Sequence, residues 1–355
     1  MTLPIGQLIA NRYEVLASLA SAAQGDVYRV RDTYEDAVCV LKLLNVATLT
    51  AGLWDEAQIL RNLADDHILE IRNADLYAGQ PYIVTALAEH GTLDSELAAT
   101  NGLGLDVDRV VSWMRQASMG VARAHDKSLV HNDLKPANLF LTASKECLVG
   151  DFGLASRVPP LPMVGVARGA TAETAAPEVR AGWATGAPPA AVTTDVYSLG
   201  ATAYWLLVAQ PPVNLVGVNG TPARMAVAAA QTTPRLRDVA PHVPAAVASI
   251  VERAMAPDPA DRYQTVADFS AALGSRSTKP RRWRRTNQHP GHLGCWMGES
   301  PGKSTYVLCL EQGVTPKQCT VTTRHATGAK VPNGSRTASM RDAALAVRAT
   351  LDKLS

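Results

Sequence analysis

The segment LVHNDLKPANLF, residues 129–140, brings together three polar side chains that could act on one reacting group. Asp133 and Asn138 lie five residues apart, with Lys135 between them, and Pro136 is typical of a loop rather than of a regular strand or helix. A loop can direct a carboxylate, an ammonium group and an amide to one point. These groups can accept a hydroxyl proton, neutralise a moving phosphoryl group and bind Mg²⁺, so the segment predicts phosphoryl transfer.

A second acidic position follows in LVGDFGLAS, where Asp151 stands thirteen residues after Asn138. A short apolar run precedes Asp151 and Gly153 follows it, which indicates a buried strand that ends in a turn. Mg²⁺ is a hard cation that prefers oxygen ligands. We therefore expect Asn138 and Asp151 to be the metal ligands of this chemistry.

These segments resemble the eukaryotic-like (Hanks-type) serine/threonine protein kinases of bacteria, in order from about Ile9 to Leu273. The family's HRDLKPxN, DFG and APE motifs fall on residues 131–138, 151–153 and 176–178. Its strand lysine, the helix glutamate that pairs with it, the start of its DxxSLG motif and the arginine that pairs with the APE glutamate fall on Lys42, Glu56, Asp195 and Arg262. So many motifs in the family's order indicate the family rather than chance.

The resemblance implies an α+β, bilobal protein-kinase-like fold over residues 1–274, with an N-lobe at 1–86 and a C-lobe at 91–274. It implies ATP and Mg²⁺ as cofactors and transfer of the γ-phosphate to serine or threonine hydroxyls of protein substrates. Asp133 would accept the hydroxyl proton, Lys135 would neutralise the phosphoryl group, and Lys42, held by Glu56, would anchor the phosphates. Glu178 and Arg262 would form a structural, bidentate ion pair.

The family's glycine-rich hairpin is altered in this chain. Its three glycines fall on Ala20, Ala22 and Gly25, and an alanine methyl group obstructs close approach of the backbone to phosphate. We therefore expect weaker ATP binding but retained catalysis. The resemblance implies that the nucleotide is lined by Gly25, Val27, Val40, Thr85, Leu87 and Phe140.

Asn132 stands where the family has an arginine before the catalytic aspartate. That arginine pairs with a phosphorylated activation segment, and asparagine has no charge for this purpose. The following segment is rich in proline and poor in hydroxyl groups, although Thr171 aligns with the family threonine that orders the substrate site. We expect no switching by phosphorylation of this segment.

The end of the chain differs in charge from the rest. Residues 275–355 hold 14 basic and 4 acidic residues, a net charge of +10, whereas residues 1–274 hold 20 and 28, a net charge of −8. This asymmetry predicts a basic flexible linker at 275–289 and a small α+β domain at 290–355. The linker is interpreted as a solvated tether, with contact to a polyanion or nucleic acid through its arginines and Trp283 as one alternative, and to an acidic membrane surface or the kinase domain as another.

Two weaker patterns lie in this C-terminal region. Its last strands and final helix resemble the end of a double-stranded RNA-binding domain whose first helix is missing. His289, His292 and Cys295 form an HxxHxxC pattern, with Cys309, Cys319 and His325 further on, a set that can bind zinc but lacks paired cysteines.

Composition sets the remaining expectations. Of the residues, 47% are hydrophobic and 19% charged, as in a soluble globular protein. The five scattered cysteines include no CxxC pair, which is typical of reduced thiols in the cytoplasm. We expect no signal peptide, no membrane span and a cytoplasmic kinase. The alternatives are a pseudokinase scaffold that presents the C-terminal domain to a polyanion or partner, and a small-molecule kinase.

Overall fold

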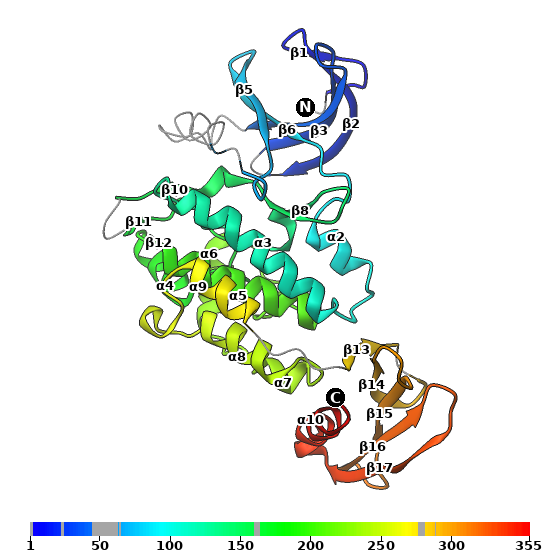
Figure 1. The fold of residues 1–355 in the computed structure, drawn as a ribbon. Helices are drawn as coiled ribbons and strands as arrows, with labels where there is room; N and C mark the ends of the chain where they lie inside the picture. The colour runs from blue at the N-terminus through cyan, green and yellow to red at the C-terminus, as the bar shows by residue number, and fades with distance from the viewer. Residues whose placement is uncertain are drawn as a thin grey trace. The chain divides into compact units, whose positions relative to one another are not determined.

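The computed structural model describes residues 3–22, 25–44, 63, 65–159, 164–275, 281–287 and 289–355. The chain divides into two compact units, which are described separately (Figure 1). One unit comprises residues 1–92 and 140–153, and the other residues 93–139 and 154–355. Glu56, the expected partner of Lys42, lies outside the described residues.

The first unit is built on a six-stranded antiparallel sheet with the strand order β1-β2-β3-β4-β6-β5. Its strands are β1 (Leu8–Ile9), β2 (Tyr13–Ala22), β3 (Gly25–Asp32), β4 (Ala37–Leu44), β5 (Ile71–Tyr77) and β6 (Gln80–Ala86). Alternate residues of these strands are buried, as period-two patterning predicts for a sheet with one covered face. Tyr13 and Tyr82 pack edge to face in this core, with ring centroids 5.9 Å apart.

An ion pair with a buried carboxylate joins the end of β3 to the turn before β2. The Asp32 carboxylate at the end of β3 is inaccessible to solvent and accepts hydrogen bonds from Arg12 Nε at 2.8 Å and Nη2 at 2.6 Å. The bidentate bond stabilises the ionised carboxylate and lowers the pKa of Asp32 from its usual value. The pair therefore stabilises the sheet only while Asp32 is ionised.

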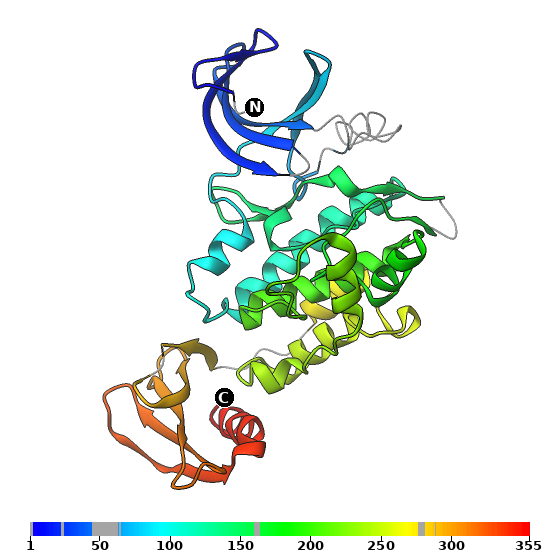
Figure 2. The same ribbon diagram turned by 180° about the vertical axis from the view of Figure 1, so that it is seen from behind.

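The second unit begins with the helices expected for a C-lobe, seen from both sides in Figures 1 and 2. They are α2 (Leu93–Ala98), α3 (Val107–His125), α4 (Pro177–Thr185), α5 (Val192–Val208), α6 (Thr221–Ala229), α7 (Leu236–Val239), α8 (Ala245–Ala254) and α9 (Val266–Gly274). Helix α5 is apolar around nearly its whole circumference, so it is buried along its length, with α3, α8 and α9 packed against it.

Short paired strands and 3₁₀ turns lie in the segments between the longer elements. Strands β7 (Leu129–Val130) and β10 (Ser156–Arg157) pair, as do β8 (Leu139–Leu141) with β9 (Cys147–Val149), and β11 (Val164–Val166) with β12 (Pro189–Ala191). Among the described residues, single 3₁₀ turns lie at η2 (Pro136–Asn138), η3 (Phe152–Leu154), η4 (Pro259–Asp261) and η5 (Met340–Asp342). The expected catalytic segment is therefore a loop and a 3₁₀ turn, as its proline predicts.

The C-terminal region folds as a five-stranded antiparallel sheet with one helix. Its strands follow in sequence order, β13 (Arg282–Thr286), β14 (His292–Glu299), β15 (Tyr306–Gln312), β16 (Gln318–His325) and β17 (Lys330–Ser339), and α10 (Ala343–Leu354) contacts β16 and β17 (Figure 1). Trp296, Leu308, Val321, Val347 and Leu351 form its apolar core. A small α+β domain was expected here, but a double-stranded RNA-binding domain was not the right comparison, because five strands in this order make a different sheet.

The expected boundary of this domain also requires correction. Residues 282–286 were expected in a flexible linker, but they form β13, whose Trp283 is only 6% exposed and packs with the core. A Cβ atom at Gly298 would lie 2.7 Å from the indole ring of Trp283, so glycine is what lets the ring approach the neighbouring strand. Buried Trp283 is therefore a core residue and does not present its ring to a nucleobase.

Within the described parts of the chain, no helix combines the length and the apolar character that a membrane span requires. All five cysteines carry free thiols. Cys147 is fully buried, which raises the pKa of its thiol far above the usual value and identifies it as a core residue rather than a nucleophile.

The Arg12–Asp32 pair predicts a pH dependence of stability. Because the folded-state pKa of Asp32 is lowered, its stabilisation is fully present above the usual aspartate pKa of about 4 and is lost as the pH falls through the folded pKa. We expect Asp32→Asn to unfold at lower denaturant concentration than the wild type at neutral pH, with a smaller difference in acid. Asp36→Asn, which removes an exposed partner of Arg31, is the control. Parallel pH profiles of wild type and Asp32→Asn would contradict this account.

Candidate functional site

Three side chains converge on the carboxylate of Asp133 in the loop after β7. Lys135 Nζ donates to Oδ2 at 2.8 Å, Asn138 Nδ2 donates to Oδ2 at 3.0 Å, and Thr171 Oγ1 donates to Oδ1 at 2.5 Å. Lys135 Nζ also donates to Thr171 Oγ1 at 2.8 Å. Asp133 is only 3% exposed, so these bonds fix its orientation. The structure thus brings Asp133, Lys135 and Asn138 together, as their spacing predicts.

A buried carboxylate from α5 holds the backbone of this loop. Asp195 is inaccessible to solvent, and it accepts hydrogen bonds from the backbone amides of His131 at 2.8 Å and Asn132 at 2.9 Å. The ring nitrogen Nε2 of His125 lies 2.8 Å from the same carboxylate. The aspartate of the DVYSLG segment therefore acts as a support that positions the two residues directly before Asp133.

Asn132 occupies the position of the family's arginine and makes neutral hydrogen bonds there. Its φ of 66° is left-handed, a conformation that asparagine tolerates better than most residues. Its amide donates to Leu154 O at 2.8 Å and Ser156 Oγ at 3.0 Å, both in the segment that follows the DFG motif. Neutral hydrogen bonds, not an ion pair with a phosphate, thus fasten this segment to the loop.

Lys42 and Asp151 meet in the other compact unit. Lys42 Nζ lies 2.8 Å from Asp151 Oδ1, and both side chains are partly exposed. Asp151 has a left-handed φ of 54°, and a Cβ atom at Gly153 would stand 3.2 Å from its Oδ1. The glycine of the DFG motif therefore leaves room beside the carboxylate, and the ammonium group compensates its charge.

A cavity of about 340 Å³ lies beside this pair. Its walls are almost entirely apolar, with Lys42 and Asp151 at one side, which suits a flat apolar ring attached to an anionic group. Five of the expected nucleotide residues line it, namely Val27, Val40, Thr85, Leu87 and Phe140. Gly25, which was also expected to line the nucleotide site, does not line this cavity.

Backbone packing is sufficient to explain the glycine at position 25. Its φ is +141°, and a Cβ atom there would lie 1.8 Å from the carbonyl oxygen of Leu43 in the paired strand β4. Ala20, by contrast, lies in the extended strand β2 opposite Val27. The backbone cost of alanine in a left-handed conformation therefore does not arise at Ala20, and only its methyl group remains as an obstruction.

The aromatic residue Phe140 depends on a neighbouring glycine. A Cβ atom at Gly150 would stand 2.7 Å from Phe140 Cε2, so only glycine fits against the ring. Sequence reasoning found Phe140 but missed Gly150, and it missed apolar lining residues such as Leu44 and Ile83. The alternation of Val40, Lys42 and Leu44 along β4 is the signal that could have placed Leu44 on the cavity side.

Glu178 and Arg262 form the bidentate pair that the sequence predicted. Arg262 Nη1 and Nη2 each donate at 2.7 Å to one oxygen of the Glu178 carboxylate. The guanidinium also donates to backbone carbonyls of Ala256, Thr193 and Pro257. Arg262 is 1% exposed, so this complete set of acceptors is what makes a buried cation tolerable.

The chain is similar in sequence to known protein kinases. A protein kinase domain profile matches residues 13–271. The serine/threonine-protein kinase PknE of Mycobacterium tuberculosis is 28% identical over 270 residues, which cover 73% of this chain and 45% of that protein. The serine/threonine-protein kinase PrkC of Bacillus subtilis is 28% identical over 280 residues, covering 76% of this chain and 41% of PrkC. The chain thus matches less than half of the length of these relatives.

Solved structures agree with these sequence matches. The kinase domain of Mycobacterium tuberculosis PknI superposes with a TM-score of 0.59 at 26% identity, over 77% of this chain and 98% of the PknI chain. The PknI chain is a kinase domain alone, and its match covers 77% of this chain. The unmatched share corresponds in size to the C-terminal sheet and helix.

The buried Arg262 pair predicts a large loss of stability on truncation. Arg262→Met leaves the Glu178 carboxylate without its partner and should lower the free energy of unfolding by about 3–5 kcal/mol. Arg31→Met is the matched control, because the ion pair of Arg31 with Asp36 is exposed and should contribute little. Denaturant titration of both variants measures the difference. Similar unfolding midpoints for the two variants would show that the buried pair is not a major support.

Proposed function

Because the chain belongs to the bacterial Hanks-type serine/threonine protein kinases, we propose that it transfers the γ-phosphate of ATP to serine or threonine hydroxyls of protein substrates. The observation that carries this proposal is the convergence of Lys135, Asn138 and Thr171 on the Asp133 carboxylate. A pseudokinase scaffold has no need for a carboxylate so closely oriented.

The nucleotide is proposed to bind in the apolar cavity of the first unit. Val27, Val40 and Phe140 would contact the adenine ring, and Thr85 and Leu87 would lie along its edge. Lys42 would bind the phosphates, in the role that its expected partner Glu56 supports. In the Lys42–Asp151 ion pair the two groups compensate each other's charge. When nucleotide and metal bind, an anionic phosphate would take the place of Asp151 beside Lys42, and Mg²⁺ would take the place of Lys42 beside Asp151.

The loop around Asp133 is proposed to act on the hydroxyl group. Asp133 would orient the hydroxyl and accept its proton, while Lys135 would neutralise the transferred phosphoryl group. Asn138 uses its amide nitrogen to hold Asp133, which leaves the amide oxygen as its ligand atom for Mg²⁺. The carboxylate of Asp151 and this oxygen are hard donors that fit Mg²⁺, which supplies charge neutralisation of the phosphates when bound.

The Glu178–Arg262 pair favours a protein substrate over a small molecule. It buttresses α4 and the APE segment, which together form the part of the lobe where protein kinases of this family bind peptides. The names of the relatives are those of serine/threonine kinases, and the chain covers less than half of their length. The proposed substrate is therefore a serine or threonine hydroxyl group of a protein.

Polyanion binding by the C-terminal region stays a prediction, in a narrower form. Arg281 is only 7% exposed and donates to the carbonyl oxygens of Leu354, Gly298 and Ser304, so it is part of the fold. Arg282 and Arg284 remain as exposed cations on the edge strand β13. A cytoplasmic location likewise stays a prediction, which the free thiols support.

Loss of the proposed catalytic groups should remove phosphoryl transfer. We expect the wild type with ATP and Mg²⁺ to label itself or a general protein acceptor on serine or threonine. Asp133→Asn should lower the rate about 10²- to 10⁴-fold, the usual contribution of a general base. Lys42→Met and Asp151→Asn should abolish detectable labelling. The measurement is phosphate incorporation, with mass-spectrometric mapping of the sites.

Matched controls separate catalysis from folding. Asp126→Asn and Lys127→Met change the same residue types at exposed positions just after α3 and should label like the wild type. Folding of every variant is checked by thermal unfolding. Equal labelling by the wild type and Asp133→Asn would point to a contaminating kinase and refute the proposal, as would the absence of labelling on any acceptor by the folded wild type.

The altered glycine hairpin predicts a gain of ATP affinity on restoring glycine. Ala20→Gly, alone and with Ala22→Gly, should lower the KM for ATP several-fold, because the methyl group no longer obstructs the phosphates. Glycine in a strand also costs about 0.5–1 kcal/mol of stability. Ala17→Gly, on the same strand β2, controls for this loosening. A KM that is unchanged, or that falls equally in the control, would contradict the steric explanation.

A further inference from the structure

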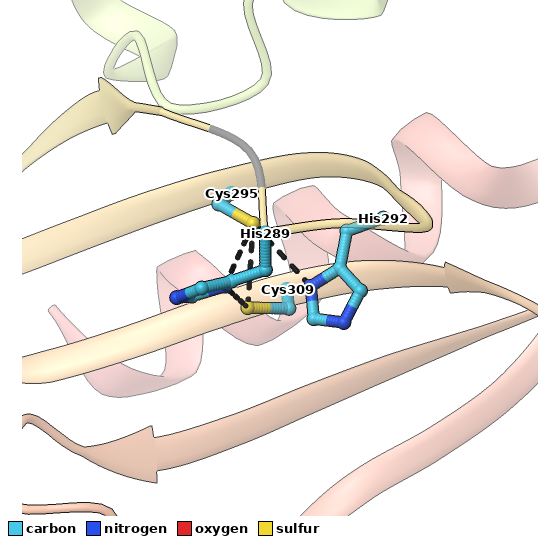
Figure 3. A group of neighbouring side chains, drawn as sticks. All are labelled: His289, His292, Cys295 and Cys309. Carbon is cyan, nitrogen blue, oxygen red and sulfur yellow. Dashed lines mark hydrogen bonds between the residues drawn. The ribbon is translucent and has the colours of Figure 1, made fainter.

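Two imidazole and two thiol groups meet in the C-terminal domain, outside the kinase site. Cys295 Sγ lies 3.4 Å from Cys309 Sγ, 3.4 Å from His289 Nδ1 and 3.5 Å from His292 Nδ1, and Cys309 Sγ lies 3.4 Å from His289 Nδ1. All four ligand atoms lie within 4.8 Å of one another. Figure 3 shows the two rings turned towards the two sulfur atoms.

Four of the six separations match those of a tetrahedral metal site. With Zn–S bonds of about 2.3 Å and Zn–N bonds of about 2.0–2.1 Å, the ligand atoms of a tetrahedron stand roughly 3.3–3.8 Å apart. The four distances between neighbouring ligand atoms, 3.4–3.5 Å, fall within this interval. A disulfide is a poor description of the two sulfur atoms, because its S–S bond is about 2.05 Å long.

The sheet register places the two cysteines side by side. Cys295 of β14 is directly opposite Cys309 of β15, and Trp296 is opposite Leu308. Trp296 and Leu308 face the core with α10, so by alternation the two cysteines point to the other face of the sheet. Both cysteines are nevertheless buried, at 0% and 6% exposure.

The histidines come from the turn that leads into β14. Gly291 has a φ of +79°, and the backbone amide of His292 donates to the carbonyl oxygen of His289 at 3.0 Å, which closes the turn. The register between β14 and β15 shifts between His292 and Gly294. This irregularity brings the first residue of the strand, His292, to the same side as Cys295, three positions later.

A carboxylate stands behind one of the histidines. His292 presents Nδ1 to Cys295, and its other ring nitrogen, Nε2, lies 3.8 Å from Glu311 Oε1. The same Glu311 oxygen accepts a hydrogen bond from Thr322 Oγ1 at 2.6 Å, which orients it. A carboxylate on the far nitrogen of a histidine is the usual arrangement for a metal-bound imidazole, because it fixes the tautomer and raises ligand basicity.

The remaining candidates of this domain lie elsewhere. Cys319 shares its face of β16 with the core residue Val321, so it points to the side of α10, and its thiol contacts the carbonyl oxygens of Ala338 and Ser339. The ring of His325 packs against Tyr306, with centroids 5.1 Å apart. The sequence pattern therefore contained the ligands, but only the register separates them from Cys319 and His325.

We propose that His289, His292, Cys295 and Cys309 bind one Zn²⁺ ion as a structural site. Four protein ligands leave no open position, and a tetrahedron of two imidazoles and two thiolates is typical of structural zinc. Binding exchanges the two thiol protons for the metal, so Zn²⁺ and two thiols give a neutral site and two released protons.

The size of the domain gives such a site a purpose. Residues 281–355 form a small domain. In domains below about 70–80 residues a single apolar core supplies little stability, and a bound metal is a common support. The metal would fasten the turn that carries His289 to the face of the sheet opposite α10.

The first test is metal content. The full chain, purified under reducing conditions with added Zn²⁺ and desalted, should hold about one zinc per chain by elemental analysis. Co²⁺ in place of Zn²⁺ should give visible d–d bands of a tetrahedral site and thiolate-to-cobalt charge-transfer absorption. Removal by a strong chelator should expose two further thiols to a thiol reagent and lower the unfolding temperature of the C-terminal domain.

Variants assign the ligands. Cys295→Ser, Cys309→Ser and His289→Gln should lose the zinc and the thiolate absorption, whereas Cys319→Ser and His325→Gln, in the same domain, should keep both. The chelator experiment on the wild type does not depend on whether a variant folds. Less than about 0.1 zinc per chain in the reduced, folded wild type, or tetrahedral cobalt bands that persist in Cys295→Ser, would overturn the assignment.

A variant of Glu311 tests whether this carboxylate positions His292 for the metal. As a positioning residue behind His292, Glu311→Gln should keep the stoichiometry of zinc but weaken its affinity about 10- to 100-fold, measured by competition with a chromophoric chelator. The amide can still accept the bond from Thr322, so folding should be unaffected. Glu299→Gln, an exposed carboxylate on β14, is the control. Unchanged zinc affinity in Glu311→Gln would refute the positioning role of Glu311. An equal loss of zinc affinity in Glu299→Gln would refute that role as well.

Discussion

The buried carboxylate of Asp195 is the constraint on which the catalytic loop depends. A carboxylate that is shielded from solvent is costly unless hydrogen bonds compensate it, and Asp195 has two backbone amides and the ring nitrogen of His125 as partners. Since those amides belong to His131 and Asn132, the same bonds that satisfy the charge also set the backbone that presents Asp133. The need to satisfy one buried charge in α5 thus determines where the reactive carboxylate stands.

The same logic recurs wherever this chain buries a charge. Arg262 is satisfied by Glu178 and three backbone carbonyls, and Arg281 in the C-terminal domain by three carbonyls and the ring of Tyr306. In each case the polar group joins segments far apart in the sequence, because only a complete set of partners makes its burial tolerable. Formal charge is therefore a poor guide to the surface here, and part of the basic character of the last domain is internal.

The sequence predicted the kinase part well because its motifs are local strings whose chemistry needs a fixed spacing. Asp133, Lys135 and Asn138 could be placed together from eight residues, and Glu178 with Arg262 from the resemblance. Gly150 could not be found, because its reason is contact with Phe140, a residue ten positions away. Strand β13 was missed for another reason: five basic residues close together suggest solvation, and only the partner strand shows that Trp283 and Arg281 face inward. The metal ligands were visible as residue types, but choosing Cys309 over Cys319 requires the register.

The contact between Phe140 and Gly150 links two positions that stand on neighbouring strands and loops. Neither can vary alone: a side chain at 150 is excluded while the ring is present, and a smaller residue at 140 would leave a gap above Gly150 at the wall of the cavity. Evolutionary change at this wall is therefore expected to pass through paired substitutions. With leucine at the first position there would be room for alanine at the second, and the shape of the cavity would change accordingly.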